Sequence, residues 1–290
     1  MFRSRFSKPT PGLSQFIRFY VQREVRNRGA FVAHPVPARA APMIVFEFGD
    51  PIEVLYCNQL APVTSPGVVV VGPQTYRRLE MHLRGALETF AIMFQPDGLH
   101  RLFSTPMQEL TNLDYEAHSV LGSFIARVRE RLGNLKSFTQ RVRLLDEVLL
   151  QRALASTGFD GVSAAANRII VAGGRADIPA LAGSAGLSMR QFERRFTQQV
   201  GVRPKLFARI ARFEAALEGK ARFVRKSWTD VAHEFGYYDQ MHMVHDFAEF
   251  TGATPSETLT HLETIFVEEI ETMRPGGPRA RDVHNARLIL

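Results

Sequence analysis

The second half of this 290-residue chain repeats one residue pattern, and the repeat restricts the folds open to that half. The offset between the copies is 50 residues up to a shared glycine and 51 residues beyond it. The matching positions are Leu181, Ala182, Gly186, Phe192, Phe196, Gly201 and Pro204 in the first copy and Val231, Ala232, Gly236, Met243, Phe247, Gly252 and Pro255 in the second. Each copy predicts an amphipathic helix, a turn opened by glycine and a second helix, which is a helix-turn-helix.

Local signals in each copy support the predicted turn. Gly186 and Gly236 stand where the end of a helix favours a residue that tolerates positive φ. Ser188 and Gln191 match the capping box that starts a helix, and Asp239 is the corresponding N-cap in the second copy. We therefore expect the second helix of each copy to begin directly after these caps.

The second helix of each copy is predicted to pack one face inward and to expose another. The inward side chains are Met189, Phe192 and Phe196 in the first copy and Met243, Phe247 and Phe250 in the second. The outward positions are Arg190, Glu193, Arg194 and Thr197, and then Gln240, Met241, His242, Val244 and His245. A recognition helix presents such a face to base edges in the major groove, where Gln pairs with adenine and Met contacts the thymine methyl group. The alternative is a helical bundle whose outward side chains bind nothing.

A basic stretch surrounds the first copy and favours the DNA-binding interpretation. Residues 162–226 contain 13 basic and 4 acidic residues, a charge of +9, whereas residues 227–262 contain no Lys or Arg and carry −6. The whole chain carries +7. Residues 204–217, which join the copies, predict a helix that starts at a proline and holds the two motifs at a fixed separation of about 34 Å, one duplex turn. This charge distribution is typical of a phosphate-binding surface.

Residues 162–262 resemble the DNA-binding domain of the AraC/XylS family of bacterial transcription regulators. The resemblance rests on the run from Leu181 to Pro204 and on the run from Trp228 to Pro255, which contains Phe250-Thr251-Gly252. It implies sequence-specific binding of promoter DNA through both recognition helices. The residues expected at the DNA are Ser188, Arg190, Glu193, Arg194, Arg195, Gln240, Met241, His242 and His245.

The second motif departs from the family pattern in its charge. Family members commonly carry Arg or Lys on the helix that leads to Thr-Gly, but this chain has His245, Ala248 and Glu249 there. We therefore expect the first motif and the linking helix to neutralise most of the phosphate charge.

The first half of the chain is predicted to be rich in β-strands. Between residues 11 and 103, short apolar runs at 43–48, 52–57, 68–71 and 90–94 alternate with turn residues, as in an antiparallel sandwich or small barrel. Helical periodicity follows at 121–132 and 135–154, and these helices are expected either to form a dimer contact or to pack on the barrel. The predicted class is α+β, with a sensor domain at 1–155, a DNA-binding domain at 162–262 and a tail at 263–290.

The first 105 residues resemble, more distantly, the cupin-like sensor domains that precede such DNA-binding domains. The resemblance rests on the segments 72–75 and 94–98 and implies a small-molecule effector pocket or a metal site. The side chains that would line such a pocket, unless they form plain core, are Tyr20, Phe46, Phe48, Tyr56 and Phe94. No metal is predicted, because His34, His82, His100 and His118 lack the spacing of metal ligands.

Composition narrows the remaining classes of function. The single cysteine, Cys57, excludes an intramolecular disulfide framework and is expected to be an inert packed residue. No apolar window reaches the ~20 residues of a membrane helix, and the N-terminus lacks a secretory signal, so we expect a cytoplasmic protein. No phosphate loop or serine nucleophile elbow is present. We expect a regulator without enzymatic activity or cofactor, as a homodimer, the alternative being a cupin-type metalloenzyme fused to a DNA-binding domain. A DNA-repair methyltransferase, which elsewhere carries this DNA-binding module, needs a metal-bound acceptor cysteine among several cysteines, so the single cysteine argues against that class.

Overall fold

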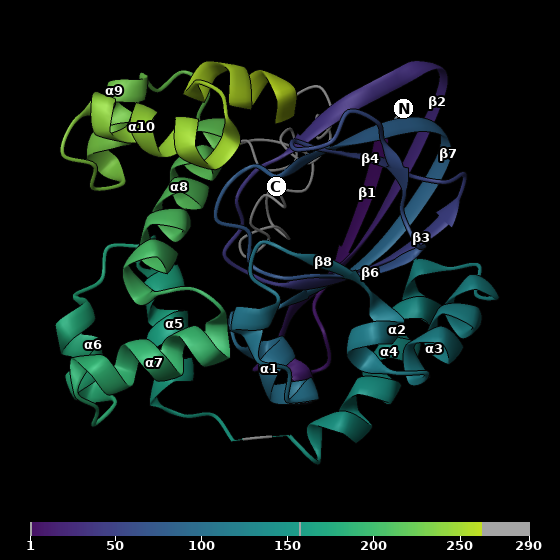
Figure 1. The fold of residues 1–290 in the computed structure, drawn as a ribbon, viewed down its shortest axis with the longest axis horizontal. Coiled ribbons are helices and arrows are strands. Elements are labelled where there is room, and N and C mark those ends of the chain that lie inside the picture. The colour runs from purple at the N-terminus through teal and green to yellow at the C-terminus, as the bar shows by residue number, and fades with distance from the viewer. Residues whose placement is uncertain (1, 157, 263–290) are drawn as a thin grey trace.

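Alternating burial organises the first half of the chain into an antiparallel sheet. A computed structural model describes residues 2–156 and 158–262 (Figure 1). The strands of the sheet are β1 (Phe2–Ser7), β2 (Ile17–Val36), β3 (Met43–Gly49), β4 (Glu53–Tyr56), β5 (Val63–Thr64), β6 (Val68–Val71), β7 (Leu79–Phe94) and β8 (Asp114–Glu116). They follow the order β1-β2-β7-β3-β6-β8, with β4 paired to β7 and β5 paired to β4. The predicted α+β class is confirmed.

The two faces of the sheet have different partners. Successive strand residues point to opposite faces, so Ile44 and Phe46 lie on one face and Met43 and Val45 on the other. The first face packs on the helices α1 (Gly98–Phe103), α2 (Ala117–Leu121), α3 (Phe124–Gly133) and α4 (Phe138–Ala153). Short 3₁₀ turns, η1 (Pro11–Leu13) and η2 (Met107–Glu109), flank this layer. The apolar stripes of α3 and α4 are buried against the sheet.

The structure corrects several boundaries predicted from the sequence. The helix expected over 121–132 is two helices, because Gly122, at a φ of 74°, separates α2 from α3. The run at 90–94 is the end of a sixteen-residue strand, and the twenty-residue β2 was not predicted. Cys57 is exposed rather than packed, because it follows the last residue of β4.

Both predicted helix-turn-helix motifs are present in the second half. After α5 (Gly161–Val171), the first motif comprises α6 (Ile178–Ser184) and α7 (Met189–Val200). The second comprises α9 (Trp228–Glu234) and α10 (Gln240–Thr251). The linking helix α8 (Pro204–Arg222) is five residues longer than predicted. Figure 1 shows α6 and α7 at one end of α8 and α9 and α10 at the other.

The sheet domain contacts the C-terminal end of each recognition helix. At α7, the Thr111 hydroxyl donates to the Gly201 carbonyl over 2.7 Å. At α10, the backbone N–H of Ala38 donates to the Phe250 carbonyl over 2.8 Å. These contacts leave the N-terminal ends of both recognition helices facing away from the sheet domain.

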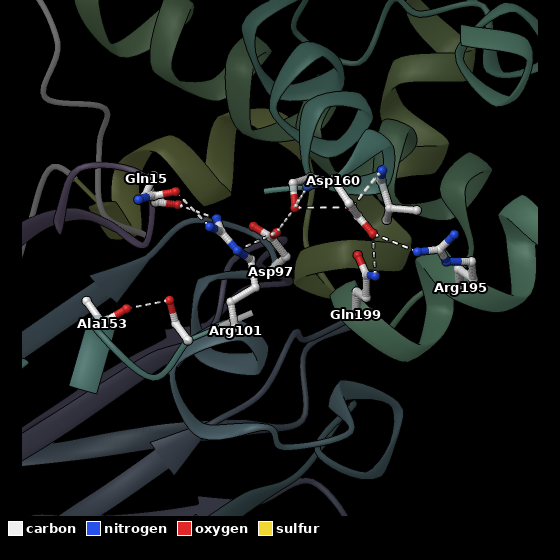
Figure 2. Close-up of polar contacts among 10 residues, drawn as sticks. Gln15, Asp97, Arg101, Ala153, Asp160, Arg195 and Gln199 are labelled. Atoms are coloured by element: carbon white, nitrogen blue, oxygen red, sulfur yellow. Dashed lines mark hydrogen bonds and ion pairs between the residues drawn. The ribbon is translucent and has the colours of Figure 1, made fainter. Parts of the chain in front are cut away.

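A buried carboxylate adds a third contact between the halves (Figure 2). Asp97, which directly precedes α1, is completely buried and accepts a hydrogen bond from the Ser163 hydroxyl of α5. Burial raises the pKa of the Asp97 carboxyl above its ordinary value. Arg101 lies 3.8 Å from the same carboxylate and also donates to Gln15. The predicted tail at 263–290 lies outside the described residues.

Replacing Gly201 with alanine is expected to destabilise the protein more than replacing Gly186. Both residues have positive φ, 95° and 68°, so alanine costs about 1–2 kcal/mol at either position. A Cβ at Gly201 would also lie 2.8 Å from the Thr111 hydroxyl and 3.0 Å from the Met107 carbonyl, whereas nothing lies within 4 Å at Gly186. We expect an added cost of about 1–3 kcal/mol for Gly201→Ala.

The fluorescence of Trp228, the one tryptophan of the sequence, during urea unfolding would measure both losses. Equal losses of stability in Gly201→Ala and Gly186→Ala would contradict the docked arrangement.

Candidate nucleic-acid interface

The first recognition helix is built as its sequence predicts. Gly186 adopts a φ of 68°, and the Ser188 hydroxyl accepts from the Gln191 N–H while the Gln191 side chain accepts from the Ser188 N–H. Phe192 and Phe196 are completely buried and hold the helix on its domain core. Met189 was predicted to point inward, but its side chain is 37% exposed because it occupies the first turn of the helix.

The exposed face of α7 carries the predicted readers of the first motif. Arg190 and Arg194 are exposed, and Glu193 is half-buried. Within the described part of the chain, no hydrogen bond or ion pair engages any of these three side chains. Their charged groups are therefore available to bases and phosphates, and a guanidinium pairs most readily with guanine.

Arg195 lies on the same helix but is directed at the protein (Figure 2). Its guanidinium donates to Asp160 over 2.9 Å, and Gln199 donates to the same oxygen over 3.0 Å. Burial acts to raise the pKa of Asp160, but the bonds from Gln199 and the Ser163 N–H, with the charge of Arg195, lower it overall. In this structure Arg195 thus bonds the N-cap of α5, and its contact with DNA stays a prediction.

The second recognition helix exposes three of its four predicted readers. Gln240, Met241 and His245 are exposed, and Gln240 accepts from the Thr229 hydroxyl over 2.7 Å, which leaves its amide N–H groups available. His242 is half-buried, with its Nε2 3.4 Å from Arg212 and its ring edge-on to Tyr237. The N-cap prediction is confirmed, because Asp239 accepts from the His242 N–H over 2.7 Å.

A buried carboxylate fixes the second recognition helix to α8. Asp246 is 1% exposed, and its two oxygens accept from Arg209 over 2.7 Å and from Arg212 over 3.2 Å. Arg209 also bonds Glu249 over 2.6 Å. The sequence contained a signal for this contact, since an acidic residue stands on the apolar stripe of Met243 and Phe247 and must find a partner there.

The same contact changes the predicted distribution of phosphate-binding charge. The linking helix was expected to neutralise phosphates, but Arg209 and Arg212 are bound to Asp246, and Lys220 donates to the carbonyls of Val224 and Lys226. The exposed cations of residues 162–262 without a protein partner are Arg168, Arg190, Arg194, Arg203, Lys205 and Arg225.

A cavity of about 350 Å³ lies inside the sheet domain, on the face opposite α2–α4. Every strand of the sheet contributes to its lining. Of the aromatic residues predicted to line an effector pocket, Tyr56 does so. Tyr20, Phe46 and Phe94 are buried in the core under the helices, and Phe48 packs against that core. The described residues contain no group of three or more His, Cys, Asp or Glu side chains that could hold a metal ion.

Two family models match the sequence. Residues 181–261 match a helix-turn-helix domain, and residues 5–116 match a domain of unknown function, DUF6597. No curated protein sequence matches the chain. In the described part of the chain, no helix has the length and apolar composition needed to cross a membrane.

Solved structures with a similar fold include ToxT from Vibrio cholerae. An apo variant of ToxT is 10% identical, with 84% of this chain and 97% of that chain covered, at a TM-score of 0.48. ToxT bound to an unsaturated fatty acid is 12% identical, with coverage of 91% and 96% and a TM-score of 0.46. The AraC-like transcriptional activator CuxR is 12% identical, with coverage of 74% and 88% and a TM-score of 0.28.

The matched helix-turn-helix region contains both motifs together with the helix that joins them. Residues 181–261 span α7 to α10 and most of α6, and so include both recognition helices. This paired arrangement is the one that the sequence pattern predicted from its two spaced copies. The second half of the chain therefore contains a helix-turn-helix domain with two recognition helices.

Proposed function

We propose that this protein is an effector-responsive regulator that reads promoter DNA with α7 and α10 in successive major grooves. The observation that carries the proposal is the exposure of the N-terminal ends of both recognition helices while their C-terminal ends are bound to the sheet domain. Recognition helices commonly contact base edges through their N-terminal residues.

The length of α8 supports simultaneous reading by both helices. Nineteen helical residues span about 28 Å at 1.5 Å per residue, close to the 34 Å of one duplex turn. The two motifs differ in their exposed charge. The first has free arginines, whereas the second exposes Gln240, Met241 and His245 and contains no Lys or Arg. The first motif supplies phosphate and guanine contacts, and the second reads adenine and thymine edges.

The sheet domain completes the proposed regulator. Its cavity is the place for a small-molecule effector, and a division at residues 1–155 and 162–262 separates the sensor from the DNA-binding domain. The protein acts in the cytoplasm, where promoter DNA lies, and a homodimer pairs two DNA-binding domains on repeated half-sites. The apolar stripes of α3 and α4 are occupied by the sheet, so the dimer contact uses other surfaces.

Selection of bound sequences from random DNA tests the proposal directly. We expect the full chain to enrich a motif with two elements about one duplex turn apart, because both recognition helices contact bases. Arg190→Ala is expected to erase the preference at one position of the first element and to weaken binding by about 1–3 kcal/mol. Failure of the wild-type protein to enrich any motif would overturn the proposed function.

Arg195→Ala serves as the matched variant on the same helix. It removes the same charge, but the guanidinium is bound to Asp160, so the enriched motif should stay unchanged. Loss of a base preference in Arg195→Ala, with none in Arg190→Ala, would reverse the assignment of the readers.

The salt dependence of DNA binding should be shallow for a protein with two motifs. Six exposed cations in each DNA-binding domain lack a protein partner among the described residues, so a plot of log K against log salt should be no steeper than about −5 per domain. Binding measured by fluorescence anisotropy over a salt series gives this slope. A slope near −7 per domain would mean that Arg209 and Arg212 leave Asp246 to contact phosphates as well.

A further inference from the structure

One buried guanidinium, that of Arg39, lines the cavity without an ion-pair partner among the described residues. Arg39 is 7% exposed, and within the described residues its guanidinium has one hydrogen-bond partner, the Met43 thioether sulfur at 2.8 Å. No acidic side chain of residues 2–156 or 158–262 forms an ion pair with it. A buried cation that is bonded only to sulfur is costly, since sulfur is a weak acceptor.

The surroundings of Arg39 increase this cost. Burial, together with the nearby charges of Arg23 and Arg18, lowers the pKa of Arg39 to about 10, while Glu214 opposes them. The guanidinium therefore remains cationic at neutral pH. His34, completely enclosed beside it, is neutral, because burial lowers its pKa to about 3.

Of the four acidic side chains that line the cavity, three accept hydrogen bonds, and the fourth, Glu116, is exposed at the end of β8. Asp114 accepts from Arg78 over 2.9 Å and from the Tyr56 hydroxyl. Glu47 accepts from the Ser65 hydroxyl over 2.8 Å, and Glu24 accepts from Gln22 over 3.1 Å. Much of the remaining lining is apolar, with Val25, Val45, Val54, Val69, Leu79, Met81, Leu83 and Leu87. Arg39 is thus the buried charged side chain of this lining that has no ion-pair partner among the described residues.

We propose that the cavity binds a small organic anion whose carboxylate pairs with Arg39 and whose apolar body packs against the valine and leucine side chains. Pairing a buried guanidinium with a carboxylate removes the cost of leaving it alone and gives a charge-assisted hydrogen bond. A volume of about 350 Å³ suits a ligand of drug size.

The chain on either side of Arg39 connects this site to the second motif. The backbone of Arg39 pairs with Gln74 in the sheet domain, with N···O distances of 2.8 and 2.9 Å. The flanking residues Ala38 and Ala40 are completely buried in the core of the DNA-binding half. The Ala38 N–H bonds the Phe250 carbonyl at the end of α10, and the Ala40 N–H bonds Glu214 of α8 over 3.1 Å.

Because Arg39 pairs within the sheet domain while its two neighbours pack in the DNA-binding half, binding of the anion at Arg39 can change the affinity for DNA. A movement of Arg39 toward a bound carboxylate also moves Ala38 and Ala40, which hold the second recognition helix and α8. This coupling route through Ala38 and Ala40 rests on the proposed function, whereas the proposed anion-binding site does not.

Competition against a neutral fluorophore tests the binding site. N-phenyl-1-naphthylamine fluoresces in apolar cavities, and 4-phenylbutyrate and 4-phenylbutan-1-ol are competitors that differ in the carboxylate. At pH 7.5 we expect the carboxylate to displace the fluorophore from the wild-type protein at about tenfold lower concentration than the alcohol. Arg39→Met should abolish this advantage and keep fluorophore binding, which also shows that the variant is folded.

Arg84→Met is the matched control, because Arg84 is exposed on β7 and does not line the cavity. It should keep the tenfold preference. Equal displacement by the two competitors in the wild-type protein, or no binding of the fluorophore, would overturn the proposed site.

The coupling is tested on a DNA fragment that the wild-type protein selects. Saturating 4-phenylbutyrate should change the DNA affinity of the wild-type protein at least threefold and leave Arg39→Met unchanged. An unchanged affinity in the wild-type protein would overturn the route through Ala38 and Ala40 alone. Absence of any DNA binding would overturn the proposed function, while the competition result would still decide the anion site.

Discussion

The carboxylate of Asp246, buried between Arg209 and Arg212, is the contact on which the geometry of the second motif depends. Removing one partner from such a buried pair typically lowers the stability of the fold by about 3–5 kcal/mol, because the remaining charge stays buried with neither a partner nor water. The pair joins α10 to α8, and α8 carries the first motif at its other end. It also engages two arginines of α8, so in the proposed complex this basic helix contributes little phosphate-binding charge.

The sheet domain holds each recognition helix at its C-terminal end. Thr111 bonds the Gly201 carbonyl that follows α7, and Ala38 bonds the Phe250 carbonyl near the end of α10. The proposed readers Arg190 and Met241 lie at the opposite ends of these helices. Contacts at the C-terminal ends allow a change inside the sheet domain to reposition the helices without blocking the base-reading face. Arg39 lies where such a change would begin.

Local signals made the DNA-binding half predictable, and long-range contacts made the rest unpredictable. Gly186, Ser188 and Asp239 act through the backbone within a few residues, so their roles could be predicted from the sequence and the structure bears them out. The roles of Arg195 and Arg209 could not be predicted, because their partners Asp160 and Asp246 are 35 and 37 residues away in sequence. β2 was missed because it carries charged residues such as Arg23 and Glu24 into a cavity, which weakens the apolar alternation of a strand.

The central claim is that two recognition helices, held on one rigid α8, read the same face of a duplex. Missing-base interference on a selected DNA site measures this most directly, because removing each base in turn maps all the bases that the protein contacts. The account predicts two groups of interfering bases about 10 base pairs apart, on one face of the DNA. A single group, or two groups half a turn apart on opposite faces, would contradict it.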